Sequence, residues 1–299
     1  MDDRRGFLMI TNRQVTHALS FDIEDWFHLV EVEATADPAT WDTFPTIVVE
    51  RTREILDILS EYNVRATFFM LGWVAARHPG LVPMITEHGH EIGTHSYWHR
   101  KVYELSPEVF REDLQESIEI LEQYPGVKVH GFRAPSFSIT PGTEWAFDVM
   151  KEVGLDYDAS LFPASRAHGG YVCDVQPHAL ESPNCGTIAE LPMSVMDAGP
   201  FRICFSGGGY FRLLPFWFIR RCFEKSELAG RSSVVYLHPR DLATNCPRVP
   251  MPLHRRFKSY IGRATTAKKL RRLLGQFKFD TCYHVLQQHD LLSDGAPAL

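Results

Sequence analysis

An alternation of short apolar segments with helical patterns constrains the fold of this 299-residue chain more than any other feature. The apolar segments have the length of strands and end in polar residues, at positions 17–21, 66–71, 91–95, 129–133, 157–160 and 234–237. Helices are expected between them from helical spacing and capping residues, at about 46–62, 83–88, 106–124, 144–153, 215–227 and 266–274. Strands that alternate with such helices imply parallel βα units, so the sequence predicts an α/β fold around a parallel sheet.

One segment, residues 162–209, interrupts this alternation. It is rich in Pro, Gly and Cys, and it contains one expected strand at about 188–191. We interpret it as long loops over one end of the strands. The length permits one large barrel or two smaller domains. Because the sequence has no repeat or obvious linker, we expect a single domain over residues 1–299, with a core at about 16–240 and an extension at about 241–299.

The bulk properties argue against several classes of protein. The formal net charge of −6 argues against nucleic-acid binding by the whole chain. No apolar run approaches the length of a membrane span, and the run at positions 7–10 is too short for a secretory signal. None of the six cysteines forms a CxxC pair, so we expect them to be reduced. A cytoplasmic location is therefore the expectation.

Side chains that can carry chemistry gather where the expected strands end. In parallel α/β barrels, catalytic groups come from the carboxyl ends of the strands. The residues at these positions are acids, histidines and one arginine: Asp22, Glu24, His95, His99, Arg133, Asp158 and His238. So many charged groups at strand ends are hard to explain as a core, and together they favour a functional site.

Two of these histidines and an acid form a candidate metal site. His95 and His99 are four residues apart, and they share a face if the chain makes a helical turn after the strand. Asp22, Glu24 and Asp25 stand close together at the end of the first strand. Two imidazoles and one carboxylate are sufficient to bind a catalytic divalent metal with one open position. Zn²⁺ suits this set, and Co²⁺, Ni²⁺, Mn²⁺ or Fe²⁺ could also occupy it.

A series of motifs gives the chain a family resemblance. From the end of the first strand to Pro239 it carries SFDIED, THSYWH, FRAPSF, YDASLFP and YLHP, in that order. With these motifs the chain resembles the polysaccharide deacetylases of the NodB-homology type, carbohydrate esterase family 4. It is similar to the branch found with exosortase and exopolysaccharide gene clusters, whose C-terminal extension resembles GGGYFR at 207–212 and the basic segment 255–281. The resemblance implies a distorted (β/α)7 barrel with a metal-dependent amidase site.

The resemblance also implies roles for residues near the metal. Asp22 matches the general base that takes a proton from the attacking water, and Arg133 matches the residue that orients this base. His95 and His99 match the two histidine ligands of the metal.

The third ligand is either Glu24 or Asp25. Many family members have two adjacent acids, of which one is the base and the other a ligand, whereas Asp22 is followed here by Ile23. Along a strand Asp22 and Glu24 point the same way and Asp25 the other way, which favours Glu24. A bend after Ile23 would favour Asp25 instead.

The remaining motifs match groups that act on the substrate. Pro135 positions Ser136, whose backbone N–H matches the oxyanion donor, although many members carry an aromatic residue in place of Ser136. His238 matches the general acid, and Asp158 matches the carboxylate that holds it. Hydrolysis of an acetamide uses such an oxyanion donor and a proton for the departing amine.

These matches predict a metal-dependent hydrolase that removes N-acetyl groups from N-acetylhexosamine units of a polysaccharide or of its lipid-linked precursor. One alternative is an allantoinase-like amidohydrolase acting on a small cyclic amide, and another is a catalytically inactive glycan-binding barrel. The helix at 266–274 carries Lys268, Lys269, Arg271 and Arg272. These form either a solvated face or a patch for an anionic glycan or lipid-linked phosphate, and so a peripheral membrane contact.

Overall fold

The structure is a computed structural model that describes residues 15–29, 32–164, 170–199 and 201–293. Its centre is a nine-stranded sheet in the order β10-β1-β2-β3-β4-β5-β7-β6, with β11 also paired to β1. Every pair in this sheet except β6–β7 is parallel, which confirms the predicted fold class. The strands are β1 (Thr16–Ile23), β2 (Thr67–Met70), β3 (Glu91–Thr94), β4 (Gly131–Phe132), β5 (Tyr157–Asp158), β6 (His178–Ser182), β7 (Gly186–Glu190), β10 (Val234–Leu237) and β11 (Lys278–Asp280).

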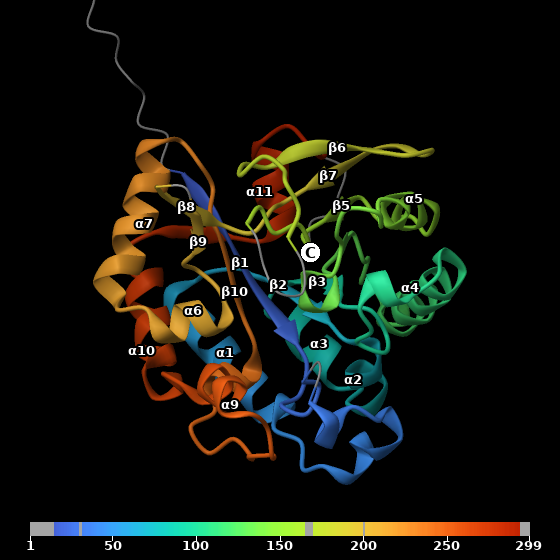
Figure 1. Cartoon of the computed structure of the whole chain (residues 1–299), viewed down its shortest axis with the longest axis horizontal. Helices are drawn as coiled ribbons and strands as arrows, with labels where there is room; N and C mark the ends of the chain where they lie inside the picture. The colour runs from blue at the N-terminus through green and yellow to red at the C-terminus, as the bar shows by residue number, and fades with distance from the viewer. Residues whose placement is uncertain (1–14, 30–31, 165–169, 200, 294–299) are drawn as a thin grey trace, which may run out of the picture.

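Helices follow most of these strands and surround the sheet (Figure 1). The α-helices are α1 (Val48–Tyr62), α2 (Gly72–Arg77), α3 (Leu81–Thr86), α4 (Pro107–Glu122), α5 (Trp145–Glu152), α6 (Gly208–Leu213), α7 (Phe216–Leu228), α8 (Pro239–Leu242), α9 (Leu253–Tyr260), α10 (Arg263–Leu274) and α11 (Cys282–Gln288). Short 3-10 helices lie at Glu33–Thr35, Pro38–Thr43, Val102–Glu104 and Pro135–Phe137. Among the described helices, none has the length and apolar content that crossing a bilayer requires.

The central strand β1 turns alternate side chains to two different environments. Leu19 and Phe21 belong to the large cluster of buried apolar side chains between the sheet and the helices. Ala18 belongs to a smaller cluster inside the barrel-like sheet. Because side chains of a strand alternate, Ser20 and Asp22 share the interior side with Ala18. β1 therefore carries polar groups along the interior toward its carboxyl end, where Asp22 is buried.

Residues 178–204 differ from the loops expected in this part of the chain. They form two antiparallel pairs, β6 with β7 and β8 (Val195–Ala198) with β9 (Phe201–Cys204). The expected strand at 188–191 overlaps β7, which also pairs with β5 and extends the central sheet. β6 alternates exposed and half-buried side chains and has no continuous apolar run. Its sequence pattern therefore could not be distinguished from that of a loop.

The C-terminal part of the described chain joins the same sheet. β11 pairs with the first residues of β1, and β2 pairs with the last residues of β1. The hydroxyl of Thr67 accepts the backbone N–H of Cys282 at the start of α11, at 2.7 Å. Helix α10 packs on α1, α6 and α8. β1 is therefore the place where early and late parts of the chain meet.

The basic residues of α10 largely make contacts within the protein. Lys269 Nζ donates to three backbone carbonyls at the end of α6, at 2.7 to 3.1 Å. Arg271 forms an ion pair with Glu61, at 2.7 Å, and the guanidinium of Arg272 lies over the ring of Phe216. These contacts favour a structural role for the α10 basic face over the alternative of an anion-binding patch.

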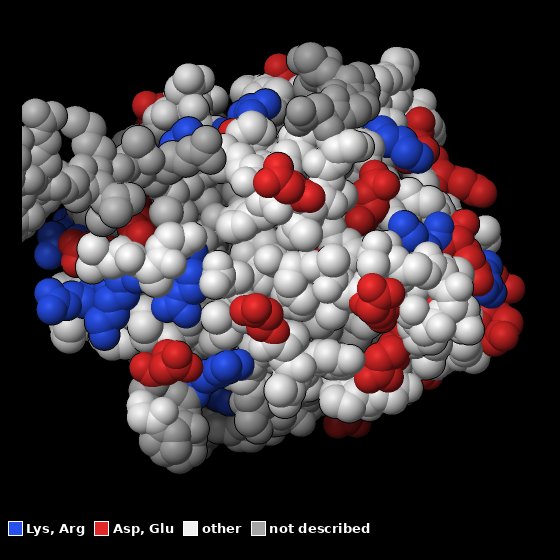
Figure 2. Space-filling model, turned by 90° about the horizontal axis from the view of Figure 1, so that it is seen from above, with Lys and Arg blue, Asp and Glu red and all other residues white. Residues whose placement is uncertain are grey.

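Charges of both signs are distributed over the face at the upper edge of Figure 1. Seen from that side, acidic side chains lie apart from one another over its centre and right, and Lys and Arg occur at the left and also at the right (Figure 2). The net charge of −6 is therefore not concentrated in one patch of this face.

The close approach of β4 to β5 gives a test of the interior packing. A Cβ on Gly131 would lie 2.0 Å from Cζ of Tyr157, whose side chain is fully buried. Gly131→Ala is therefore expected to destabilise the protein by about 1–3 kcal/mol, as overpacking of a core typically does. The matched control is Gly80→Ala, where a Cβ meets no atom within 4 Å and φ is −79°. Equal melting temperatures for the two variants would contradict the packing described.

Candidate functional site

A cleft of about 560 Å³ opens where the strands of the barrel-like sheet end. Its walls come from the ends of β1 and β10, the loops after β3 and β4, and helices α6 and α9. It brings together six residues expected from the sequence to act at the metal or on the substrate: Asp22, Glu24, His95, His99, Ser136 and His238. Arg240, Asp241 and Arg212 also line it.

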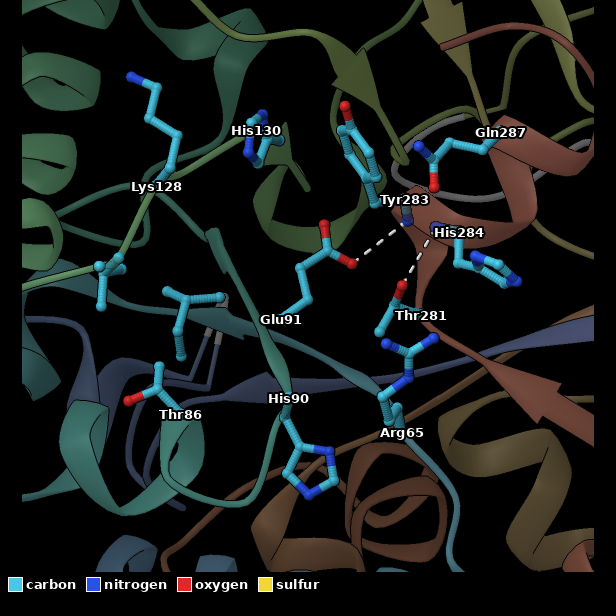
Figure 3. A pocket seen from close by; sticks show the side chains of 13 residues that line it. Arg65, Thr86, His90, Glu91, Lys128, His130, Thr281, Tyr283, His284 and Gln287 are labelled. Atoms are coloured by element: carbon cyan, nitrogen blue, oxygen red, sulfur yellow. Dashed lines mark hydrogen bonds between the residues drawn. The ribbon is translucent and has the colours of Figure 1, made fainter. Parts of the chain in front are cut away.

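A second pocket, of about 190 Å³, lies at the other end of the strands (Figure 3). Its basic side chains Arg65, Lys128 and His130 each lie beside an acidic side chain, at 2.6 to 3.0 Å. Glu91 accepts the backbone N–H of Tyr283, as Figure 3 shows. Charged groups at this end are thus engaged in structural contacts, and in barrels of this kind the chemistry occurs at the carboxyl ends of the strands. We therefore take the larger cleft as the functional site.

Glu24, His95 and His99 can hold a metal ion. Each offers one ligand atom, and these atoms all lie within 4.8 Å of one another. Glu24 Oε2 is 2.7 Å from His99 Nε2. Burial alone would raise the pKa of Glu24, but the charges of Arg240 and His99 hold it well below its usual range. Glu24 is therefore an ionised carboxylate beside two imidazoles, a set of donors that suits a catalytic divalent metal.

The hydrogen bonds of His95 prepare its other nitrogen to bind a metal. His95 Nδ1 lies 2.7 Å from the backbone carbonyl of Arg133, and because a carbonyl only accepts, Nδ1 must carry the proton. Nε2 is then left with a free lone pair, which is the arrangement that metal-binding histidines adopt. Burial lowers the pKa of His95 to about 4, so the imidazole is neutral at pH 7.

Asp25, the alternative third ligand, instead supports the start of α1. Its carboxylate accepts the backbone N–H groups of Ile47 and Val48, at 3.1 to 3.3 Å, and the hydroxyl of Thr46. A carboxylate that satisfies free N–H groups of a first turn stabilises the helix, which explains why Asp25 lies outside the metal-binding group.

The segment that carries the two histidines is a loop and not the expected helical turn. Ser96 and His99 have positive φ angles of 68° and 55°. Two hydrogen bonds from neighbouring helices hold the loop. The N–H of Gly72, at the start of α2, donates to the carbonyl of Ser96, at 2.9 Å, and Asp113 of α4 accepts the N–H of Tyr97, at 2.6 Å. These contacts bring the two imidazole rings to a centroid distance of 5.1 Å without helical periodicity.

Arg133 lies fully buried in the interior and contacts Asp22. Its Nη1 lies 2.8 Å from Asp22 Oδ1 and 2.8 Å from Ser20 Oγ, and its Nε donates to the carbonyl of Ala159. Its guanidinium also lies 4.2 Å from the ring centroid of Phe69. This geometry fixes one oxygen of Asp22 on Arg133 and leaves the other, Oδ2, toward the cleft, 3.7 Å from His238 Nε2.

The carboxylate that contacts His238 is Asp241, which corrects the assignment of Asp158 made from the sequence. His238 Nδ1 lies 3.0 Å from Asp241 Oδ2, and Asp241 Oδ1 lies 2.9 Å from Arg212 Nε. Burial would raise the pKa of Asp241, but Arg212 and His238 hold it well below its usual range. Asp241 therefore stays ionised and orients His238, so that Nε2 faces the cleft.

Asp158 is engaged elsewhere at the end of β5. Ser160 donates its hydroxyl to Asp158, and Glu190 of β7 lies beside it. Burial raises the pKa of Asp158 to about 6 and the pKa of Glu190 well above its usual value. Two buried carboxyl groups in contact share a proton because both cannot ionise together. This pair has no contact with His238, and it fixes β5 to β7.

Pro135 and Ser136 occupy the turn after β4. Ser136 lines the cleft and has a positive φ of 56°. Non-glycine residues rarely adopt this conformation, and those that do are often at functional sites.

Arg240 completes the wall of the cleft, with Nη2 at 3.2 Å from Glu24 Oε1.

Arg212, Arg240 and Asp241 also lie at the cleft, and the sequence patterns did not predict their roles. A signal for Asp241 was present, because His-Pro-x-Asp is a helix start in which the third residue after His238 can reach back to it. Arg212 ends the GGGYFR motif at 207–212, but its contact with Asp241 could not be predicted, since the two residues lie 29 positions apart and only the fold brings them together.

The chain matches two family models. Residues 34–157 match the polysaccharide deacetylase family, and residues 159–287 match a domain of unknown function, DUF3473. A peptidoglycan-N-acetylglucosamine deacetylase of Bacillus cereus is 36% identical over 131 residues, which cover 40% of this chain and 47% of the relative. The chain thus spans less than half of the length of that relative.

Two solved structures share the fold over almost their whole length. One, described as a candidate polysaccharide deacetylase from Mycobacterium smegmatis, has a TM-score of 0.63 at 24% identity and covers 93% of this chain and 92% of its own. An allantoinase has a TM-score of 0.61 at 17% identity, and the match covers 93% of this chain and 91% of the allantoinase chain. At these identities the likeness shows the fold alone, and it confirms the expected barrel-like architecture.

The two candidate third ligands can be separated by isosteric substitutions. Glu24→Gln is expected to lower Zn²⁺ affinity by more than the roughly 10–100-fold that loss of an outer partner costs, because it removes an ionised ligand. Asp25→Asn is expected to keep the metal and to lose about 0.5–2 kcal/mol of stability, since α1 loses part of its cap. Elemental analysis and thermal unfolding of both variants check this. Metal loss in Asp25→Asn with retention in Glu24→Gln would reverse the assignment.

Proposed function

Because the chain carries a polysaccharide deacetylase domain of the NodB, carbohydrate esterase family 4 type, continued by a DUF3473 domain, we propose that it is a metal-dependent deacetylase. Its substrate would be a polysaccharide that contains N-acetylhexosamine, or the lipid-linked precursor of one. The acetyl group would leave as acetate after hydrolysis of the amide bond. The relative from Bacillus cereus, named for its action on N-acetylglucosamine of peptidoglycan, supports this choice of sugar.

The observation that supports the proposal most is the position of His238 across from the base. Its Nε2 lies 3.7 Å from Asp22 Oδ2 and 3.7 Å from Glu24 Oε1. The side chains of Asp22 and His238 both line the cleft, so a substrate bound there would meet a carboxylate and an imidazole together. General base and general acid catalysis require such a pair.

Each residue of the site would then perform one task. Asp22 Oδ2 takes the proton of the attacking water, while Arg133 holds the other oxygen of Asp22 in place. His238 Nε2 gives a proton to the departing amine, and Asp241 keeps the imidazole oriented. The backbone N–H of Ser136, presented by Pro135, stabilises the oxyanion, a contribution typically worth about 3–4 kcal/mol.

Glu24, His95 and His99 would hold the metal, with Zn²⁺ as the first candidate. A bound divalent metal lowers the pKa of water and polarises the acetamide carbonyl. Arg240, at 3.2 Å from Glu24, keeps this ligand ionised.

Neither alternative function has equal support. The fold is shared with an allantoinase, so the fold alone does not exclude a cyclic amide as substrate. The curated relative and the deacetylase family model favour an N-acetylated glycan instead. An inactive glycan-binding barrel would not need the complete set of base, acid and metal donors that the cleft contains.

The wider setting is part of the proposal. We propose a role in exopolysaccharide synthesis, on the motifs shared with that branch, and a cytoplasmic location, which the six free cysteines support. We also propose that the chain acts as one domain, because residues from both matched segments line the same cleft.

Substrate trials test the activity. Oligomers of N-acetylglucosamine are expected to release acetate in the presence of Zn²⁺, and allantoin is expected to remain unchanged. His238→Gln and Asp22→Asn should each lower turnover by about 10²–10⁴-fold with metal still bound. Asp22→Asn also leaves Arg133 without its anion, so its unfolding must be measured before its rate is interpreted. Consumption of allantoin without release of acetate would refute the deacetylase.

The position of Asp241 behind His238 gives a separate test. Asp241→Asn is expected to lower turnover, because His238 loses the carboxylate that orients its ring. Asp158→Asn is the matched control and should retain turnover. Loss of turnover in Asp158→Asn alone would restore Asp158 as the residue that orients the acid.

A further inference from the structure

Exposed apolar side chains are concentrated beside the cleft. Among the described residues, the large apolar side chains that are exposed include five on α6, the start of α7 and α9: Tyr210, Leu213, Trp217, Leu253 and Phe257. Leu253 is 80% exposed and Phe257 is 54% exposed. An accumulation of this kind on a monomer typically marks an interaction surface.

Two helices present these side chains around one opening. Tyr210 and Leu213 of α6 and Phe257 of α9 line the cleft. Leu253 lies one turn before Phe257, so the two share a side of α9. Arg212 fixes the two helices to each other, since its guanidinium donates to the carbonyls of residues 258, 259 and 261 at 2.8 to 3.0 Å. The apolar side chains therefore form a fixed rim and not a set of independent positions.

The same rim is basic and its helices carry no acid. Arg256 and Lys258 are exposed on α9, and no Asp or Glu occurs in the sequence from 242 to 279 or in α6. On the face shown in Figure 2, away from α9 at the lower edge of Figure 1, charges of both signs are mixed. The elements of the rim thus differ in charge from the acidic chain as a whole.

We propose that the α6–α9 rim, formed by Tyr210, Leu213, Leu253, Arg256, Phe257 and Lys258, docks on an anionic lipid bilayer. This rests on the proposed function and names where its substrate lies: the cleft would receive a glycan that is anchored in the membrane. A short helix with apolar and basic residues in this pattern lies in the plane of an interface. Negative charge on the cytoplasmic leaflet attracts such a helix. The occupant is a bilayer and not a second copy, because two basic rims would repel each other.

Vesicle sedimentation tests the rim directly. The protein is expected to bind vesicles of phosphatidylglycerol and phosphatidylcholine, to bind phosphatidylcholine vesicles far more weakly, and to dissociate in high salt. Leu253→Glu with Arg256→Glu, both outside the cleft, should weaken binding at least about tenfold. Their release of acetate from soluble N-acetylglucosamine oligomers should be unchanged.

The control makes the same chemical change at the other end of α7. Leu228→Glu with Lys225→Glu alters one exposed leucine and one exposed basic residue, about 18 Å along the helix from its start. It should retain vesicle binding. Absence of binding by the unaltered protein, or equal loss in both double variants, would overturn the proposal.

Two further readouts separate the possible failures. Light scattering should find the same mass for the unaltered protein and the rim variant, and a dimer that only the rim variant dissociates would assign the rim to a second copy. Vesicle binding does not depend on turnover. Binding through the rim without acetate release would therefore refute the deacetylase proposal alone, and acetate release without binding would refute the rim alone.

Discussion

The ion pair between Arg133 and Asp22 is the constraint on which the site depends. A guanidinium that is fully buried inside a barrel must have an anion close by, since an isolated buried charge costs several kcal/mol. Arg133 comes from the end of β4 and Asp22 from β1, so their contact spans the interior of the sheet. Because the carbonyl of Arg133 also accepts the proton of His95 Nδ1, one residue orients both Asp22 and His95.

The side of the cleft that carries His238 depends on the segment that matches DUF3473. Arg212 binds the end of α9 through three carbonyls and Asp241 through its Nε, and Asp241 in turn contacts His238. The segment that matches a domain of unknown function therefore supplies His238, the carboxylate that contacts it and a wall of the cleft. The cleft is thus formed by residues of both matched segments.

The sequence predicted the parts of the fold and site that follow from local periodicity. Apolar strands, helix spacing and polar strand ends identified β1 to β5, β10 and the main helices, and the alternation within β1 favoured Glu24 over Asp25. Contacts between distant residues were not predictable. They include the contact of Asp25 with the start of α1, the contact of Asp241 rather than Asp158 with His238, and the loop contacts that bring His95 and His99 together. These depend on packing, which a pattern of residue types along the chain does not encode.

The pairing of β1 has a consequence for biosynthesis. One edge of β1 stays unpaired until β10 has been synthesised, and β11 pairs with β1 later still. Both partners lie more than 200 residues after β1 in the chain. A nascent chain on the ribosome therefore exposes an unpaired strand edge, which is prone to aggregation and a target for chaperones. Asp22 and His238 can face each other only after β10 has been synthesised, so the cleft is complete only late in translation.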